Sequence, residues 1–158
     1  MKIFIGADHR GYEMKGFLKD WMLGLKSEIM DCGAEEFNPD DDYVDYATKV
    51  ANSVVSCQLS VVSRGIVICG SGVGVCVVAN KVKGIRCGLG LNTEQVRATR
   101  KDDDINVLAL ASDFVEVEEA KKMVQVFLET DFFAEERYVR RLEKISELEI
   151  QKHTGESG

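Results

Sequence analysis

The sequence predicts an α/β fold in which a doubly wound parallel sheet of five strands lies between two layers of helices. Two observations carry this prediction. Short apolar runs alternate about five times with longer stretches whose apolar residues recur at helical spacing. The run at 65–69 is continuously apolar and ends in glycines, as a strand buried on both faces does. Right-handed crossovers then give a three-layer, Rossmann-like α/β/α sandwich.

The elements follow from these patterns in order. We expect strands at 2–7, around 27–31, and at 65–69, 85–91 and 105–111. We expect helices at 11–25, 44–58, 72–83, 93–101, 114–130 and 134–149. The Asp-rich segment 33–43, which contains Asn38-Pro39, reads as a loop. The last helix follows the closed strand–helix pattern, and its apolar positions predict packing on a partner subunit, with its own sheet as the alternative.

Length and charge limit the function. The 158 residues predict one domain over 1–150 with a frayed tail over 151–158. The 20 basic and 27 acidic residues give a net charge of −7, which argues against a nucleic-acid partner but allows a small anionic ligand. Because no stretch approaches about 18 apolar residues, we expect no membrane partner.

The cysteines and histidines indicate the compartment and the cofactors. The 5 cysteines are odd in number and contain no C-x-x-C, so neither a disulfide framework nor a zinc site is expected. Free thiols fit a reducing cytoplasm. With only 2 histidines, a His-rich metal site is not expected either.

Three places carry residues suited to chemistry, and all three are expected at the carboxyl ends of strands. The first is G-A-D-H-R-G at 6–11, where a strand runs directly into Asp8 and His9. Either residue would cap the following helix, or both would contact a ligand at the mouth of the sheet.

The second place is I-C-G-S-G-V-G at 68–74, where alternate glycines let backbone N–H groups turn inward and hold an anion or an enediolate. Cys69 is either a reactive thiol, whose thiolate is favoured near a helix N-terminus, or a buried structural thiol beside a tight turn. The spacing matches neither a dinucleotide fingerprint, nor a P-loop, nor a nucleophile elbow.

The third place is R-Y-V-R-R at 137–141. Arg137 and Arg141 are four residues apart and share a helix face. Two guanidinium groups on one face suit a phosphate, and the alternative is a solvated basic turn beside acidic neighbours.

Together these segments resemble the ribose-5-phosphate isomerase B family, which includes the galactose-6-phosphate isomerase subunits. The resemblance extends to about residue 149. Further matching stretches are D-Y-V-D-Y-A at 42–47, A-N-K-V-K-G-I-R at 79–86 and N-V-L-A-L at 106–110.

The resemblance implies an aldose–ketose isomerase without metal or nucleotide cofactor, acting through a cis-enediol(ate) on a small phosphorylated sugar. It implies a homodimer or tetramer whose active sites lie between subunits. Cys69 matches the catalytic base of thiol-using members, Ser71 the hydroxyl that assists proton movement between sugar oxygens, and Asp102 stands at the ring-opening histidine. The substrate-binding residues it implies are Asp8, His9, Tyr43, Gly70, Gly72, Gly74, Asp103, Arg137 and Arg141.

The sequence departs from the family in one segment. Family members read R-x-H-N-D-A-N before the last strand, whereas this chain reads R-K-D-D-D-I-N at 100–106. The histidine and the following asparagine are therefore Asp102 and Asp103, and an arginine that often joins the phosphate site is Asp113. Ribose 5-phosphate is the expected substrate. A six-carbon phosphate (galactose 6-phosphate or allose 6-phosphate) and a non-catalytic sugar-phosphate-binding relative are the alternatives.

Overall fold

A computed structural model describes residues 1–154, with side chains described through residue 150. It contains the expected five-stranded sheet, and all strands are parallel. In spatial order the strands are β2 (Glu28–Asp31), β1 (Lys2–Ala7), β3 (Ser63–Cys69), β5 (Val107–Ala111) and β4 (Cys87–Leu89). β5 therefore lies between β3 and β4, which places β4 at an edge.

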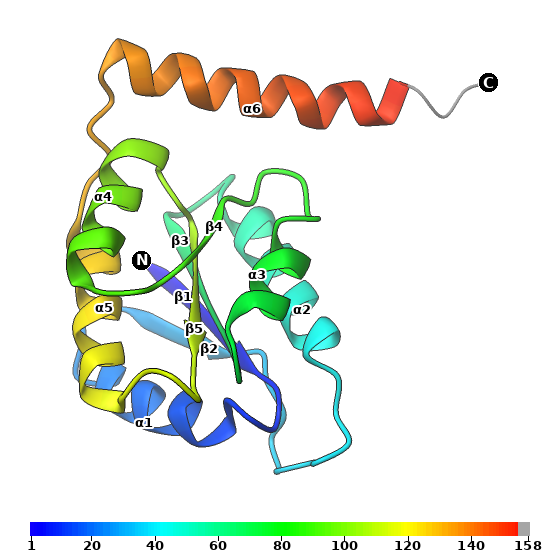
Figure 1. Ribbon diagram of the computed structural model, residues 1–158, viewed down its shortest axis with the longest axis vertical. Coiled ribbons are helices and arrows are strands. Elements are labelled where there is room, and N and C mark those ends of the chain that lie inside the picture. Colours follow the sequence, from blue (N-terminus) through cyan, green and yellow to red (C-terminus); the bar gives the residue numbers. More distant parts are fainter. Residues whose placement is uncertain (155–158) are drawn as a thin grey trace.

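Helices cover both faces of the sheet, so the predicted doubly wound sandwich is confirmed (Figure 1). On one face lie α1 (Tyr12–Met22), α4 (Thr93–Asp103) and α5 (Val117–Glu129). On the other lie α2 (Tyr43–Cys57) and α3 (Val73–Ala79). No helix of the described residues is long and apolar enough to cross a bilayer.

Side chains of the central strand alternate between two hydrophobic cores. Ile66 and Ile68 of β3 belong to the core under α1, α4 and α5. Val67 and Cys69 belong to the core under α2 and α3. This period of two is the strand repeat, and it points the Cys69 side chain toward α3.

Several elements are shorter than expected. α3 ends at Ala79 instead of residue 83, because the chain must turn before β4, and Gly84 adopts a left-handed φ of 85° in that turn. β4 covers only Cys87–Leu89 of the expected 85–91, with Gly88 inside it and Gly90 directly after it. Segment 112–116 forms a turn instead of the first turn of α5, since the Phe114 N–H donates to the Ala111 carbonyl.

The last helix, α6 (Glu136–Thr154), lies apart from the two helical layers (Figure 1). It passes the amino ends of the strands, because Ile145 and Leu148 line one cavity with Ile85 and Ile105, which precede β4 and β5. The helix continues to Thr154, past the expected end at residue 149. The expected frayed tail falls partly on residues 155–158, outside those described.

Candidate active site

The glycine loop after β3 has a backbone that only glycine adopts without strain. Gly72 has a left-handed φ of 72°, and a Cβ there would come within 2.5 Å of Leu89 Cδ1 and 3.0 Å of the Leu110 carbonyl carbon. This sharp turn directs the chain from β3 into α3 beside the ends of β4 and β5.

The thiol of Cys69 ends β3 directly before this loop, and its residue is 5% exposed. Within the described part of the chain, the backbone N–H groups of Gly70, Ser71 and Gly72 find no hydrogen-bond acceptor. The Ser71 side chain is exposed, and its Oγ accepts the Val73 N–H at 3.3 Å. A buried thiol, a hydroxyl and three unpartnered donors therefore meet at one strand end, as expected.

Asp8 and His9 lie at the neighbouring end of β1. Asp8 is buried, and its Oδ1 accepts the backbone N–H groups of Arg10 and Gly11, both at 3.1 Å. These bonds form a turn before α1, whose N-cap is Gly11 without a side-chain cap, so the helix-capping role considered for Asp8 was wrong. His9 instead contacts Asp41, whose Oδ1 accepts its ring Nδ1–H at 2.8 Å. Asp41 lies in the Asp-rich loop and was not singled out by its sequence.

Two further side chains pack directly on the glycine loop. The ring of Tyr43 lies against Gly74, where an added Cβ would come within 2.9 Å of ring carbons. The guanidinium of Arg10 lies against Gly70, where an added Cβ would come within 2.4 Å of Cζ. Tyr43 was an expected site residue, whereas Arg10 was missed. Its one sequence signal was its place directly after Asp8 and His9.

The expected phosphate arginines lie at the other end of the sheet, so their predicted position at strand carboxyl ends was wrong. α6 begins beside the end of α4 and passes the amino ends of the strands (Figure 1). Arg137 and Arg141 do share one helix face, because both guanidiniums stack on Tyr138, with Cζ 4.6 and 5.8 Å from the ring centroid.

Asp102 and Asp103 lie near these arginines, in the last turn of α4. Partial burial and the neighbouring Asp102 carboxylate raise the pKa of Asp103, against the opposing charges of Arg141 and Arg86. Within one chain, the expected site residues therefore form two groups. One group surrounds the glycine loop, and the other lies where α4 meets α6.

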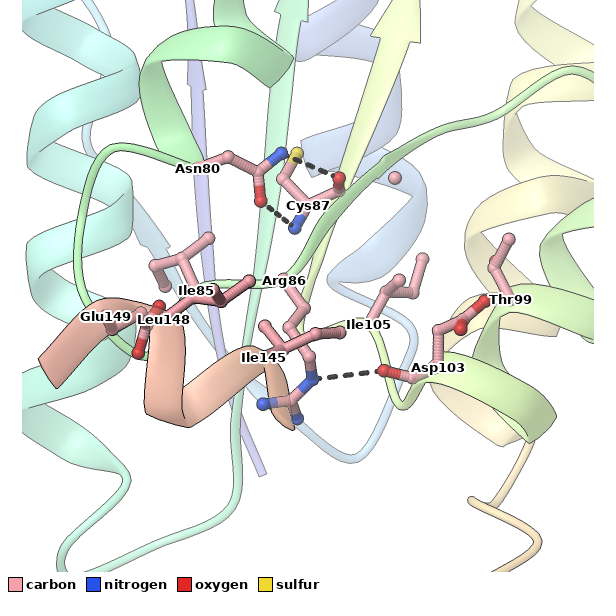
Figure 2. A pocket seen from close by; sticks show the side chains of 11 residues that line it. Asn80, Ile85, Arg86, Cys87, Thr99, Asp103, Ile105, Ile145, Leu148 and Glu149 are labelled. Atoms are coloured by element: carbon pink, nitrogen blue, oxygen red, sulfur yellow. Dashed lines mark hydrogen bonds between the residues drawn. The ribbon is translucent and has the colours of Figure 1, made fainter. Parts of the chain in front are cut away.

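A cavity of about 430 Å³ opens beneath α6 (Figure 2). Asn80 holds the strand β4 at its wall, donating to the Cys87 carbonyl at 2.9 Å and accepting the Cys87 N–H at 2.8 Å. Across the cavity, Arg86 Nε donates to the Asp103 carbonyl at 3.0 Å. Glu149 of α6 closes one side and accepts the Gly84 N–H at 3.1 Å. Residues of β4, α4 and α6 therefore line this cavity together.

Among the residues with described positions, no group of three or more His, Cys, Asp or Glu side chains is arranged to hold a metal ion. The 5 cysteines are all free thiols. The expectation of a reaction without metal or cofactor stays a prediction.

The fold and the glycine loop together define an α/β protein with free backbone donors at the carboxyl edge of its sheet, an arrangement suited to a small anion. The chain belongs to the Ribose/Galactose Isomerase family, whose sequence model matches residues 3–145. The resemblance stated from the motifs is thereby confirmed.

Relatives match over nearly the whole chain. A putative sugar phosphate isomerase of Bacillus subtilis is 40% identical over 94% of this chain and 97% of its own. A probable ribose-5-phosphate isomerase B of Mycoplasma pneumoniae is 41% identical over 95% of this chain and 96% of its own. The crystal structure of Mycoplasma genitalium ribose-5-phosphate isomerase B with bound ribulose-5-phosphate is 38% identical. It superposes with a TM-score of 0.88, covering 94% of this chain and 95% of that one.

Proposed function

We propose that this chain is a type B ribose-5-phosphate isomerase, which interconverts ribose 5-phosphate and ribulose 5-phosphate in the non-oxidative pentose phosphate pathway. One observation carries the proposal beyond family membership. The buried Cys69 thiol lies directly before three backbone N–H groups that have no acceptor within the described residues. A base beside an unoccupied set of donors is what proton removal next to a carbonyl requires.

In the forward direction, the Cys69 thiolate removes the proton from C2 of the open-chain aldose. The electron pair moves onto the C1 carbonyl oxygen, which gives the cis-enediolate. The backbone N–H groups of Gly70, Gly72 and Gly74 stabilise the negative oxygen of this intermediate. Ser71 assists transfer of the O2 proton to O1, the Cys69 thiol returns its proton to C1, and the ketose results. Asp8 and Tyr43 contact the sugar.

We propose that the phosphate is bound by His9 of one chain together with Arg137 and Arg141 of a second copy. The separation of the two groups of residues supports this assembly, since one chain holds its arginines at the opposite edge from its own loop. A homodimer, alone or paired into a tetramer, is the simplest assembly that brings them together. In it, α6 packs on the partner subunit.

Asp102 of the second copy stands where relatives carry the ring-opening histidine, and we assign it proton transfer to and from the ring oxygen. Like Arg137 and Arg141, it belongs to the group of residues where α4 meets α6. Asp103 beside it contacts the sugar. Partial burial first, and then the Asp102 carboxylate, raise the pKa of Asp103.

The test of this function is the rate of ribulose 5-phosphate formation from ribose 5-phosphate. We expect turnover by the unmodified chain and a loss of about 10³-fold or more in Cys69→Ala, the range for removing a general base. Cys57→Ala is the matched control, because Cys57 is a partly buried free thiol at the end of α2. Unchanged turnover in Cys69→Ala would exclude Cys69 as the base.

The Asp102 and Asp103 carboxylates favour a second candidate, an isomerase of galactose 6-phosphate or allose 6-phosphate, because the wall facing the sugar ring differs from that of pentose-specific relatives. Comparing kcat/KM on five- and six-carbon phosphates decides between them. Thermal stabilisation by ribose 5-phosphate without turnover would instead indicate a non-catalytic binding protein.

We further propose that residues 1–150 act as one domain, that the enzyme works in the cytoplasm, and that it needs no metal, nucleotide, nucleic acid or membrane. Five free thiols and a net charge of −7 support this setting. Full activity after treatment with a metal chelator is the expected result, and loss that is restored by one divalent ion would contradict it.

A further inference from the structure

Arg10 places a guanidinium directly on the glycine loop. An added Cβ at Gly70 would come within 2.4 Å of both Cζ and Nε of Arg10, and 2.8 Å of Nη1. The guanidinium therefore occupies the space that glycine leaves open at the first residue of the loop. This contact brings a positive charge next to the Cys69–Gly70 peptide.

The loop after β5 fixes Arg10 in this place. Asp113 forms an ion pair with Arg10 through Nη2. The Ser112 hydroxyl donates to the Arg10 carbonyl at 2.9 Å. The backbone N–H groups of Ser112 and Asp113 donate to the Cys69 and Gly70 carbonyls, each at 3.0 Å. The side chain and the backbone of Arg10 are therefore both bonded to residues 112–113, and these residues are in turn hydrogen-bonded to the glycine loop.

Part of the guanidinium remains available. Its hydrogen bond to Asp113 uses Nη2, and no acceptor is found for Nε or Nη1 among the described residues. Those two nitrogens lie on the side that contacts Gly70. The Arg10 side chain is 56% exposed, so a ligand can reach it.

The charges around Arg10 differ between its two sides. Away from the loop, Glu13, Asp113 and Glu116 line a hollow of about 250 Å³ with Arg10, which makes that side unfavourable for an anion. Toward the loop lie the backbone N–H groups of Gly70 and Ser71, which have no acceptor among the described residues. The free donors near Arg10 therefore lie on the loop side, away from the Glu13 and Glu116 carboxylates.

We propose that Arg10 is a further substrate-binding residue, which contacts the phosphate of the ligand through guanidinium N–H groups that Asp113 leaves free. The inference rests on the proposed function for the identity of the ligand, a phosphorylated sugar. A guanidinium N–H that meets a phosphate oxygen forms a charge-assisted hydrogen bond. Arg10 thereby gives each chain its own positive charge beside its own loop.

The test measures the affinity of the folded chain for inorganic phosphate, by calorimetry and by thermal stabilisation. We expect Arg10→Ala to weaken phosphate binding about tenfold or more, as for the loss of a charge-assisted hydrogen bond. Arg10→Lys should recover part of this loss, because it keeps the charge without the planar guanidinium. Arg97→Ala is the matched control, since Arg97 is an exposed arginine on α4 and its loss changes the net charge equally.

The inference is overturned if Arg10→Ala binds phosphate as tightly as the unmodified chain or as Arg97→Ala, or if the unmodified chain binds no phosphate. A circular dichroism spectrum confirms that each variant is folded. Where turnover is measurable, Arg10→Ala should raise KM for ribose 5-phosphate more than it lowers kcat. Phosphate binding needs no turnover, so loss of binding in Arg10→Ala without any isomerase activity would support this inference and contradict the proposed function. Isomerase activity of the unmodified chain, together with unchanged phosphate binding in Arg10→Ala, would contradict this inference and support the proposed function.

Discussion

Asp41 accepts two hydrogen bonds from His9, one from the backbone N–H at 2.9 Å and one from ring Nδ1 at 2.8 Å. The Asp41 side chain is 4% exposed, and the two residues are 32 positions apart in the chain. Because Nδ1 donates to a buried carboxylate, the ring is held in one orientation and Nε2 remains for the ligand. Burial and the charge of Asp41 also raise the pKa of the nearby Tyr46.

We expect Asp41→Asn to lower kcat/KM about tenfold, equivalent to about 1.4 kcal/mol, because the His9 ring loses the charge that orients it. Steady-state kinetics with ribose 5-phosphate measure the effect. Asp40→Asn removes an exposed carboxylate from the adjacent position and should leave kcat/KM unchanged. Equal values for both variants would show that the Asp41–His9 contact does not orient the ring.

Gly72→Ala should destabilise the fold by about 2 kcal/mol or more, since alanine is strained at a φ of 72° and its Cβ would meet Leu89 Cδ1 at 2.5 Å. Urea unfolding monitored by circular dichroism gives the change in the free energy of unfolding. Gly16→Ala is the control, because Gly16 lies within α1 and an added Cβ meets nothing within 4 Å. That substitution should stabilise by roughly 0.5–1 kcal/mol. The prediction fails if both glycines tolerate alanine equally.

Cys76 should react with iodoacetamide with a midpoint near pH 7. A hydrogen bond from the Cys87 thiol and one from the Asn80 amide outweigh burial and lower the pKa of Cys76 to about 7. Because the thiolate is the reacting form, the alkylation rate rises as pH increases through this value. Mass spectrometry after brief labelling measures it. Cys87→Ala should move the midpoint toward about 8.5, the value of a free thiol, whereas Cys57→Ser should not. A midpoint unaffected by Cys87→Ala would contradict the assignment.

Asp31 should make stability depend on pH in acid. Its carboxylate binds Lys15 Nζ, a side chain 4% exposed, at 3.0 Å. Burial opposes ionisation of Asp31, but hydrogen bonds from Lys19, the Gly33 N–H and Lys15 outweigh it and lower its pKa. A carboxyl whose pKa is lowered by folding stabilises fully above its unfolded pKa of about 4, and this contribution is lost as pH falls below that value.

Asp31→Asn should therefore lower the free energy of unfolding at pH 7 by about 3–5 kcal/mol, because it leaves the buried Lys15 charge without an opposite charge. The difference from the unmodified chain should shrink below about pH 4. Urea unfolding at several pH values measures both effects. Glu36→Gln removes an exposed carboxylate and is the control. A constant difference at all pH values would exclude Asp31 as the titrating group.

Local sequence patterns predicted most helices and strands, and the part of the site around the glycine loop. The apolar run and the glycines around Cys69 placed β3, the loop and the thiol correctly, because strand alternation and a glycine turn act over a few residues. The last turn of the predicted α3 and the ends of β4 were wrong, since Gly84 and the edge position of β4 limit them. Asp41 and Arg10 were missed because their partners are distant in sequence: His9 for one, Gly70 and Asp113 for the other.

The sequence by itself determined the parallel α/β class, the glycine loop with Cys69, and the pairing of Arg137 and Arg141 on one helix face. Each follows from spacing within one element. Only the tertiary structure decided that β5 lies between β3 and β4, that Arg10 rests on Gly70, and that α6 lies at the amino edge, away from the loop. These relations depend on how distant elements pack, and a repeat within one helix or strand carries no information about its neighbour across the sheet.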